Sequence, residues 1–279
     1  AQVILGGDIP RRKIIEAIEA ETGLVVDVAS CRVGWSGSTT INRLTLRIDE
    51  SAEPLAHVSR VDVKHNNLLG VLWSRELRIA TVDLSGATLR AKQDERDTWD
   101  IERAVERVIE QQQGKPAADV SPIITAEGLQ LQAGGRAVSF EGTMNVRVVD
   151  EKVRIEPTSM TLTSAQDAFE PITAAGGIVR ASAQRVAVDG VKIESGANTA
   201  QVDGQWTLPD GGGGHQLVAT IVTAGSLRDV AWDVTMQITA LGSTPQQMGA
   251  HVSLTRGEIA HGDVAPIDLV GLAAVIKLQ

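Results

Sequence analysis

The sequence predicts a mainly β fold with two amphipathic helices. Apolar residues alternate with polar ones over most of the chain, only two stretches repeat them at helical spacing, and turn-forming residues separate the alternating runs. A chain of 279 residues, 43% of them hydrophobic, can bury a core in one large domain or in two ordinary ones.

The first predicted helix covers about residues 10–21. Asp8 can cap its N-terminus, Pro10 suits its first turn and Gly23 can end it. Its apolar residues recur at helical spacing, so we expect one face to lie on an apolar surface. That stripe consists of Ile14, Ile15 and Ile18.

The second predicted helix covers about residues 100–113. Asp100 is the expected N-cap, and Gly114 and Pro116 close the helix. Its apolar face is predicted to consist of Ile101, Val105, Val108 and Ile109.

Between these helices the period-two alternation predicts half-exposed strands. The parity of the apolar positions changes between Ile79 and Val82, which indicates a bulge or a shifted strand boundary. Residues 111–122 are polar and contain Gly and Pro, so we expect a linker there. We therefore divide the chain into residues 1–115 and residues 116–279.

The second part consists of short alternating runs that predict an antiparallel meander. We expect turns between runs at Asp150–Lys152, at Glu156–Pro157 and at Asp189–Gly190. No repeat of fixed length is present, so both an irregular extended sheet and a β-sandwich fit the pattern.

The composition argues against several function classes. A net charge of -9 repels phosphate backbones, and 3% aromatic residues offer few stacking platforms, so we expect no nucleic-acid partner. Cys31 is the only cysteine and the five histidines are scattered, so we expect no metal and no cofactor. Residues 34–38 approach a nucleophile elbow, but Ser38 replaces its second Gly, and we predict no enzyme activity.

Four stretches of the first part follow one another in a characteristic order. The helix IIEAIEAETG (14–23) precedes a strand and then INRLTLRI (41–48). Residues 57–93 then read as a strand, an apolar turn and two strands. They lead into DTWDIERAVERV (97–108), which opens the second helix.

This order resembles the N-terminal region of the AsmA-like family, which includes TamB, over about residues 10–110. The opening of the second helix is similar to the Trp-Asn-Leu step of many members, with Asp100 and Ile101 in place of Asn and Leu. Beyond residue 110 the chain resembles the family's strand-rich continuation in texture only.

The resemblance implies an inner-membrane anchor preceding Ala1, a periplasmic body, and an elongated, curled antiparallel sheet. The family's apolar groove is thought to shelter phospholipid acyl chains between the inner and outer membranes. Arg11, Arg12 and Lys13 would then lie near anionic head groups, although a solvated helix start explains them equally well. The candidate groove residues are Leu44, Leu46, Ile48, Val61, Val63, Leu77, Ile79, Val82, Leu84, Met144, Val146, Val148, Val153, Ile155, Val202, Trp206, Val234 and Met236.

Two alternatives stay open. A β-sandwich whose apolar faces cover each other explains the alternation without a ligand. An exposed strand edge could instead pair with a strand of an outer-membrane protein, which would make the chain an assembly module.

Overall fold

A computed structural model describes residues 4–6, 8–67, 78–94, 97–114, 121–165, 168–209, 214–227, 230–243, 249–261, 264–268 and 273–277. These residues are mainly strands with two helices, which confirms the predicted fold class. The chain forms two compact units, residues 1–151 and residues 152–279. This boundary lies later than the predicted division at 115, because the strands that follow the second helix belong to the first unit.

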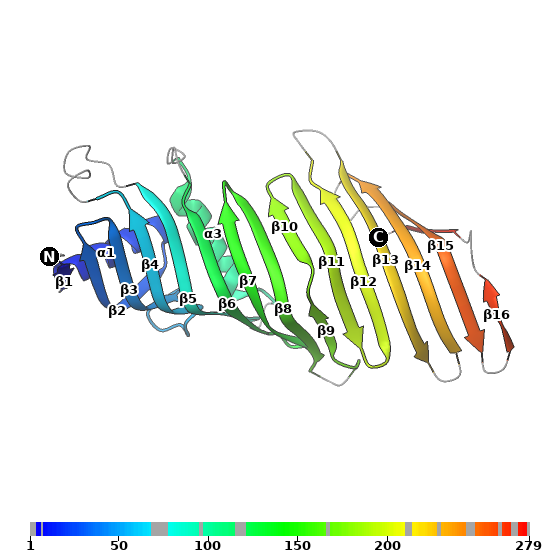
Figure 1. The fold of residues 1–279 in the computed structure, drawn as a ribbon. Helices are drawn as coiled ribbons and strands as arrows, with labels where there is room; N and C mark the ends of the chain where they lie inside the picture. Colours follow the sequence, from blue (N-terminus) through cyan, green and yellow to red (C-terminus); the bar gives the residue numbers. More distant parts are fainter. Residues whose placement is uncertain are drawn as a thin grey trace. The chain divides into compact units, whose positions relative to one another are not determined.

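The first unit is a sheet in which each strand pairs with its neighbours along the chain (Figure 1). The departure from the predicted antiparallel pattern is β5 with β6, which run parallel. A helix connects these two strands, and only such a crossover returns the chain for a parallel pairing. The elements are β1 (Ile4–Gly6), α1 (Asp8–Thr22), β2 (Val25–Gly34), β3 (Ser38–Arg47), β4 (Ala56–His65), β5 (Ile79–Lys92), α3 (Asp100–Gln112), β6 (Ile123–Gly134) and β7 (Val138–Val149).

Helix α1 begins at Asp8, so Asp8 lies in its first turn rather than before it. The helix ends as predicted at Gly23, whose φ of 67° is left-handed and whose N–H donates to the carbonyl oxygen of Glu19 at 2.8 Å. The predicted apolar stripe is confirmed, because its three isoleucines pack against the buried cluster of β2, β3 and β4.

Helix α3 starts differently from the prediction, because Trp99 rather than Asp100 is its N-cap. The N–H of Trp99 donates to Glu102 Oε2 at 3.3 Å. The Asp100 carboxylate instead accepts the N–H of Lys92 at 2.8 Å, which ties the helix start to the end of β5. The predicted apolar face is only partly buried: Val108 packs against a core cluster, while Val105 and Ile109 are 51% and 55% exposed. Ala104, which the prediction did not include, is the buried residue of this helix.

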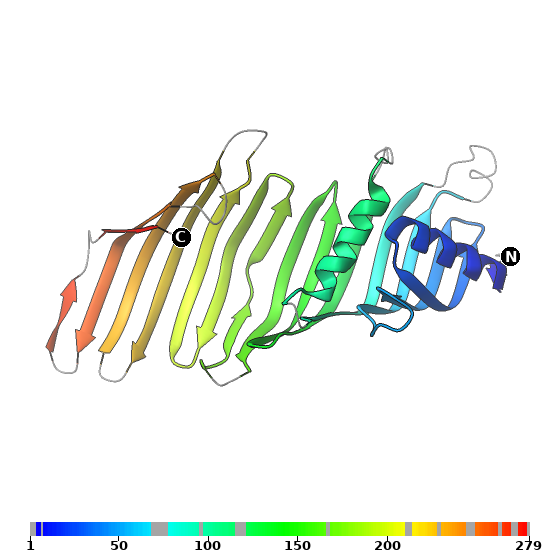
Figure 2. The ribbon, with the colours of Figure 1, turned by 180° about the vertical axis from the view of Figure 1, so that it is seen from behind.

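The core of the first unit lies between the sheet and the two helices, which cover the same face (Figure 2). Val28 is completely buried at its centre. Arg107 fixes α3 by donating from Nη1 to the carbonyl oxygen of Ile48 at 2.6 Å and by pairing with Asp49 at 3.0 Å. Gln112 Nε2 donates to the carbonyl oxygen of Glu21 at 2.9 Å, which joins α3 to α1.

The second unit is an antiparallel sheet, and no helix occurs among its described residues (Figure 1). Strands β9 and β10 both lie between β8 and β11, and β16 and β17 pair with opposite ends of β15. The strands are β8 (Lys152–Ser164), β9 (Ile172–Ala175), β10 (Ile178–Ser182), β11 (Arg185–Ser195), β12 (Asn198–Thr207), β13 (His215–Leu227), β14 (Val230–Gly242), β15 (Gly249–His261), β16 (Val264–Asp268) and β17 (Ala273–Lys277).

The predicted turn at residues 150–152 is confirmed, because Asp150 and Glu151 lie in the turn between β7 and β8. The other two predicted turns of this part lie inside strands, so those two predictions were wrong. Glu156–Pro157 falls within β8, and Asp189–Gly190 falls within β11, where the register with β12 shifts between Val188 and Val191. At Gly190, whose φ is 66°, the bulge needs the same residue type as a turn, because both place a residue in the left-handed region. Local sequence therefore could not separate them.

We predict that Val28→Ala lowers the free energy of unfolding of the first unit by about 2 kcal/mol, because it removes two buried methyl groups and leaves a cavity. Val105→Ala is the control: that side chain is 51% exposed on α3, and the change should stay within about 0.5 kcal/mol. Urea unfolding of both variants measures the difference. An equal loss of unfolding free energy in both variants would contradict the assignment of Val28 to the core.

Candidate functional site

The candidate groove residues of strands β3 to β5 belong to the core of the first unit. Ile48 and Val61 are 5% and 4% exposed and lie in the buried clusters. Helix α1 packs on the cluster of Val61, and Ala104 of α3 belongs to the cluster of Ile48, so these side chains do not form an open surface. The other candidates that pack against this core are Leu44, Leu46, Val63, Val82 and Leu84.

The suspected irregularity near Ile79 is confirmed as a bulge. His65 pairs with Ile79 and Lys64 pairs with Thr81, so Ala80 is the extra residue. Ile79 itself is half-buried beside this bulge. Leu77 lies outside the described residues.

Three candidates of β7 share one face of the sheet. Met144, Val146 and Val148 pair with apolar residues of β6, namely Leu129, Ala126 and Ile124. Leu129 packs against the larger core cluster, so these candidates continue the face that the helices cover. Met144 is buried, and the two valines are half-buried.

In the second unit, strand register aligns apolar residues into rows that cross β11 to β15. One row joins Val191, Val202, Ile221, Met236 and Leu254 through consecutive strand pairs. Directly paired side chains on one face are close enough to pack side by side. The sheet thus gathers the candidates Val202, Trp206, Val234 and Met236 on one face.

Three further rows extend this apolar face along the strands. A second row contains Trp206 and a third contains Val234, while a fourth contains small residues at β12 and β13. The rows are Val186, Trp206, Leu217, Ala240 and Ala250; Ile193, Ala200, Thr223, Val234 and Gly257; and Val188, Gly204, Ala219, Ile238 and Val252. We call these four rows the apolar face.

Val153 and Ile155 lie on β8, beyond this face but on the same side of the sheet. Ile155 pairs with Val179 of β10, which in turn pairs with Val188 of the apolar face. Val153 pairs with Ala181 in the same manner. Both candidates are half-buried.

The apolar face is large, and no helix occurs among the described residues of its unit. The face spans five strands that lie about 4.8 Å apart. Its four rows are about 6.7 Å apart along the strands, so the face measures roughly 20 by 20 Å. Neither buried core cluster of the described residues includes a residue of this unit, whereas the facing sheets of a sandwich would create one. Most side chains of the face stay half-buried. An apolar patch of several hundred Å² is typical of a binding surface.

Sequence reasoning missed the contribution of β13 to this face. Leu217 and Ile221 lie on it, whereas Val218 and Val222 lie on the opposite side and are 46% and 42% exposed. Because both sides of β13 carry apolar residues, alternation alone does not show which side faces inward. The pairing of Trp206 with Leu217 decides it.

Bulges keep the apolar face continuous along the strands. In β11, Val186 and Val188 lie before Asp189–Gly190, and Val191 and Ile193 lie after it. If β11 were a regular strand without a bulge, the extra residue would turn the second pair of side chains to the opposite side of the sheet. Gly190 has a φ of 66°, and its N–H donates to Asp203 Oδ1 of β12 at 2.7 Å.

The first unit also contains a bulge with a left-handed glycine. Its register shifts between Ala126 and Leu129, where Gly128 has a φ of 62° and donates its N–H to Asn145 Oδ1 of β7 at 2.9 Å. Gly86 of β5 also has a left-handed φ, of 60°, beside Ser59 of β4. Left-handed residues thus recur where strands of either unit change parity.

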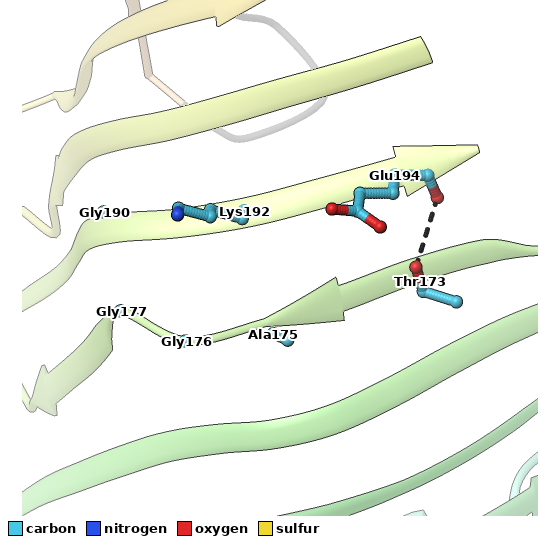
Figure 3. A pocket seen from close by; sticks show the side chains of 7 residues that line it. All are labelled: Thr173, Ala175, Gly176, Gly177, Gly190, Lys192 and Glu194. Carbon is cyan, nitrogen blue, oxygen red and sulfur yellow. Dashed lines mark hydrogen bonds between the residues drawn. The ribbon is translucent and has the colours of Figure 1, made fainter. Parts of the chain in front are cut away.

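A hollow of about 430 Å³ lies between β9 and β11, beside the bulge of the second unit (Figure 3). Gly176, Gly177 and Gly190 lack the side chains that would fill it. Lys192 and Glu194 line it with opposite charges, and Thr173 Oγ1 donates to the carbonyl oxygen of Glu194 at 3.5 Å. The hollow is polar and open, so the bulge explains it without a ligand.

Titratable groups with shifted pKa values do not converge on a site. Burial raises the pKa of the Cys31 thiol, which is 4% exposed in the core. The hydrogen bond from Arg60 lowers the pKa of Asp62, and these two residues form an ordinary surface pair at 2.6 Å. In the described part of the chain, no three His, Cys, Asp or Glu residues lie close enough together to hold a metal ion.

Comparison with known proteins adds no assignment. No protein-family model, curated protein or solved structure matches this chain. Neither described helix has the length and hydropathy needed to cross a lipid bilayer. The apolar face of the second unit is therefore the candidate site on structural grounds alone.

We predict that Gly177→Ala destabilises the second unit more than Gly190→Ala. Both glycines have φ near 66°, which costs an alanine about 1 kcal/mol. A β-carbon on Gly177 would also lie 2.5 Å from the carbonyl oxygen of Asp189, and this clash raises the cost to about 3 kcal/mol, whereas Gly190 has open space.

Gly249→Ala is the control for both variants, because a β-carbon there meets nothing within 4 Å and its φ is not left-handed. It should change the free energy of unfolding by less than about 0.5 kcal/mol. Thermal unfolding of the three variants tests the order. Equal effects of all three would show that the bulge conformation does not matter.

Proposed function

We propose that the apolar face of the second unit shelters phospholipid acyl chains, as part of a periplasmic, membrane-anchored lipid-transport protein. The observation that carries this proposal is the alignment of apolar rows across β11 to β15, in a unit whose described residues contain no helix. The carrier transfers lipid between the inner and outer membranes, as the resemblance to AsmA-like proteins implies.

The chemistry of the face suits an acyl chain. An acyl chain offers no directional groups, so its binding needs only continuous apolar contact. Half of a bilayer core of about 30 Å is about 15 Å, and a face of roughly 20 Å accommodates that length. At about 25 cal/mol per Å², covering roughly 400 Å² contributes at most about 10 kcal/mol, since the side chains are already half-buried.

The basic start of α1 gives less support to membrane contact than the sequence suggested. Arg11 donates from Nε to the carbonyl oxygen of Val28 at 2.5 Å and lies 3.7 Å from Asp27. Lys13 pairs with Glu16 at 2.6 Å. Internal partners thus account for two of the three basic residues, and the proposal does not depend on them.

Strand pairing with an outer-membrane client has weaker support. The outer edge of β15 is already paired with β16 and β17. A client at that edge would have to pair with these short strands, and β16 contains Pro266, which has no N–H to donate.

We predict that a photoreactive benzophenone side chain at Met236 crosslinks to phospholipid, whereas one at Gln237 does not. Met236 lies on the apolar face, and its neighbour Gln237 is exposed on the opposite side of the same strand. The full chain is mixed with phosphatidylethanolamine vesicles and irradiated, and the adducts are measured by mass spectrometry. Equal labelling at both positions, or none at either, would contradict the proposal.

A further inference from the structure

Two ring nitrogens at one end of the apolar face have no hydrogen-bond partner. Trp206 Nε1 and His215 Nδ1 are both closed off from solvent and unpaired. The two rings are in contact, with centroids 5.7 Å apart and an angle of 46° between their planes. They come from the end of β12 and the start of β13 (Figure 1).

Strand register places both rings on the apolar side of the sheet. Trp206 pairs with Leu217, and His215 precedes Leu217 by two residues in β13, so the three side chains share one side. His215 pairs with Gly242 of β14, which has no side chain. The ring pair therefore lies at one end of a surface whose only other polar side chain, among the four rows, is Thr223.

A buried N–H without a partner costs about 1–3 kcal/mol, and native proteins leave few of them. The Trp206 Nε1–H can only donate, while His215 Nδ1 donates or accepts according to its tautomer. The missing partner must therefore supply at least one acceptor oxygen. Trp206 pairs with Val186 and Leu217 on the apolar side of the sheet, so an oxygen attached to an acyl chain meets both requirements.

We propose that Trp206 and His215 bind the oxyanion head of an acyl amphiphile, a carboxylate or a phosphate, whose chain lies along the apolar face. This inference rests on the proposed function and adds the position and chemistry of the head group. The head lies at the end of β12, after a small rotation of the rings exposes their nitrogens. The chain then runs along the strands toward the row of Val234, across about 20 Å.

The test compares three probes on the full chain. The fluorescent fatty acid cis-parinarate carries a carboxylate, oleoyl lysophosphatidate carries a phosphate, and diphenylhexatriene carries no head. Trp206→Phe keeps an aromatic ring at this position but removes the indole N–H donor. We therefore expect about tenfold weaker binding of at least one oxyanion probe. Binding of diphenylhexatriene should stay within about twofold. His215→Phe should weaken the binding of the same probe.

Trp232→Phe is the matched control, because Trp232 lies on the same side of β14 and its nitrogen is not among the buried unpaired atoms. It should leave the binding of all three probes unchanged. If Trp206→Phe weakens the binding of parinarate alone, the head group is a carboxylate. If it weakens the binding of lysophosphatidate alone, the head group is a phosphate. Circular dichroism confirms that each variant is folded.

Two results would overturn the inference while leaving the proposed function intact. The first is unchanged oxyanion binding in Trp206→Phe, and the second is an equal loss in Trp206→Phe and Trp232→Phe. If the unsubstituted chain binds none of the three probes, the proposed function fails as well.

Discussion

A sheet with one apolar face must bring that face into contact with something other than water, and the organisation of this protein depends on this constraint. In the first unit α1 and α3 cover the apolar side of the sheet, because the isoleucines of α1 pack against one buried cluster and Ala104 of α3 belongs to the other. In the second unit no helix occurs among the described residues, yet the apolar rows continue strand after strand. The difference between the two units is the physical reason to look for a ligand in the second.

The irregularities of the sheet serve the same constraint. Long strands twist. In a regular strand, an extra residue would turn the apolar side chains that follow it to the opposite face of the sheet. Here two of the extra residues are glycines held by a hydrogen bond, Gly190 by Asp203 and Gly128 by Asn145. The left-handed glycines therefore preserve the apolar face on both sides of a bulge, and the hollow beside Gly177 is a consequence of the same arrangement.

Period-two alternation and the two helical stripes were sufficient to predict the mainly β class and the packing of α1. The sequence could not distinguish Asp189–Gly190 as a bulge from a turn, because both require the same backbone conformation. It also could not separate covered from open faces: Val61 and Met236 show the same alternation, but only Val61 lies in a core on which a helix packs. The unpaired nitrogens of Trp206 and His215 became visible only when register brought β12 and β13 together.

Our main proposal is that the apolar face of the second unit holds lipid. It is tested most directly by mass spectrometry of the lipids that remain with the full chain after purification from envelope extracts and complete removal of detergent. We expect phospholipid in at least equimolar amount, released when the chain is unfolded in urea. A folded, monomeric protein that carries no lipid would contradict it, because the face would then be stable in water without an occupant.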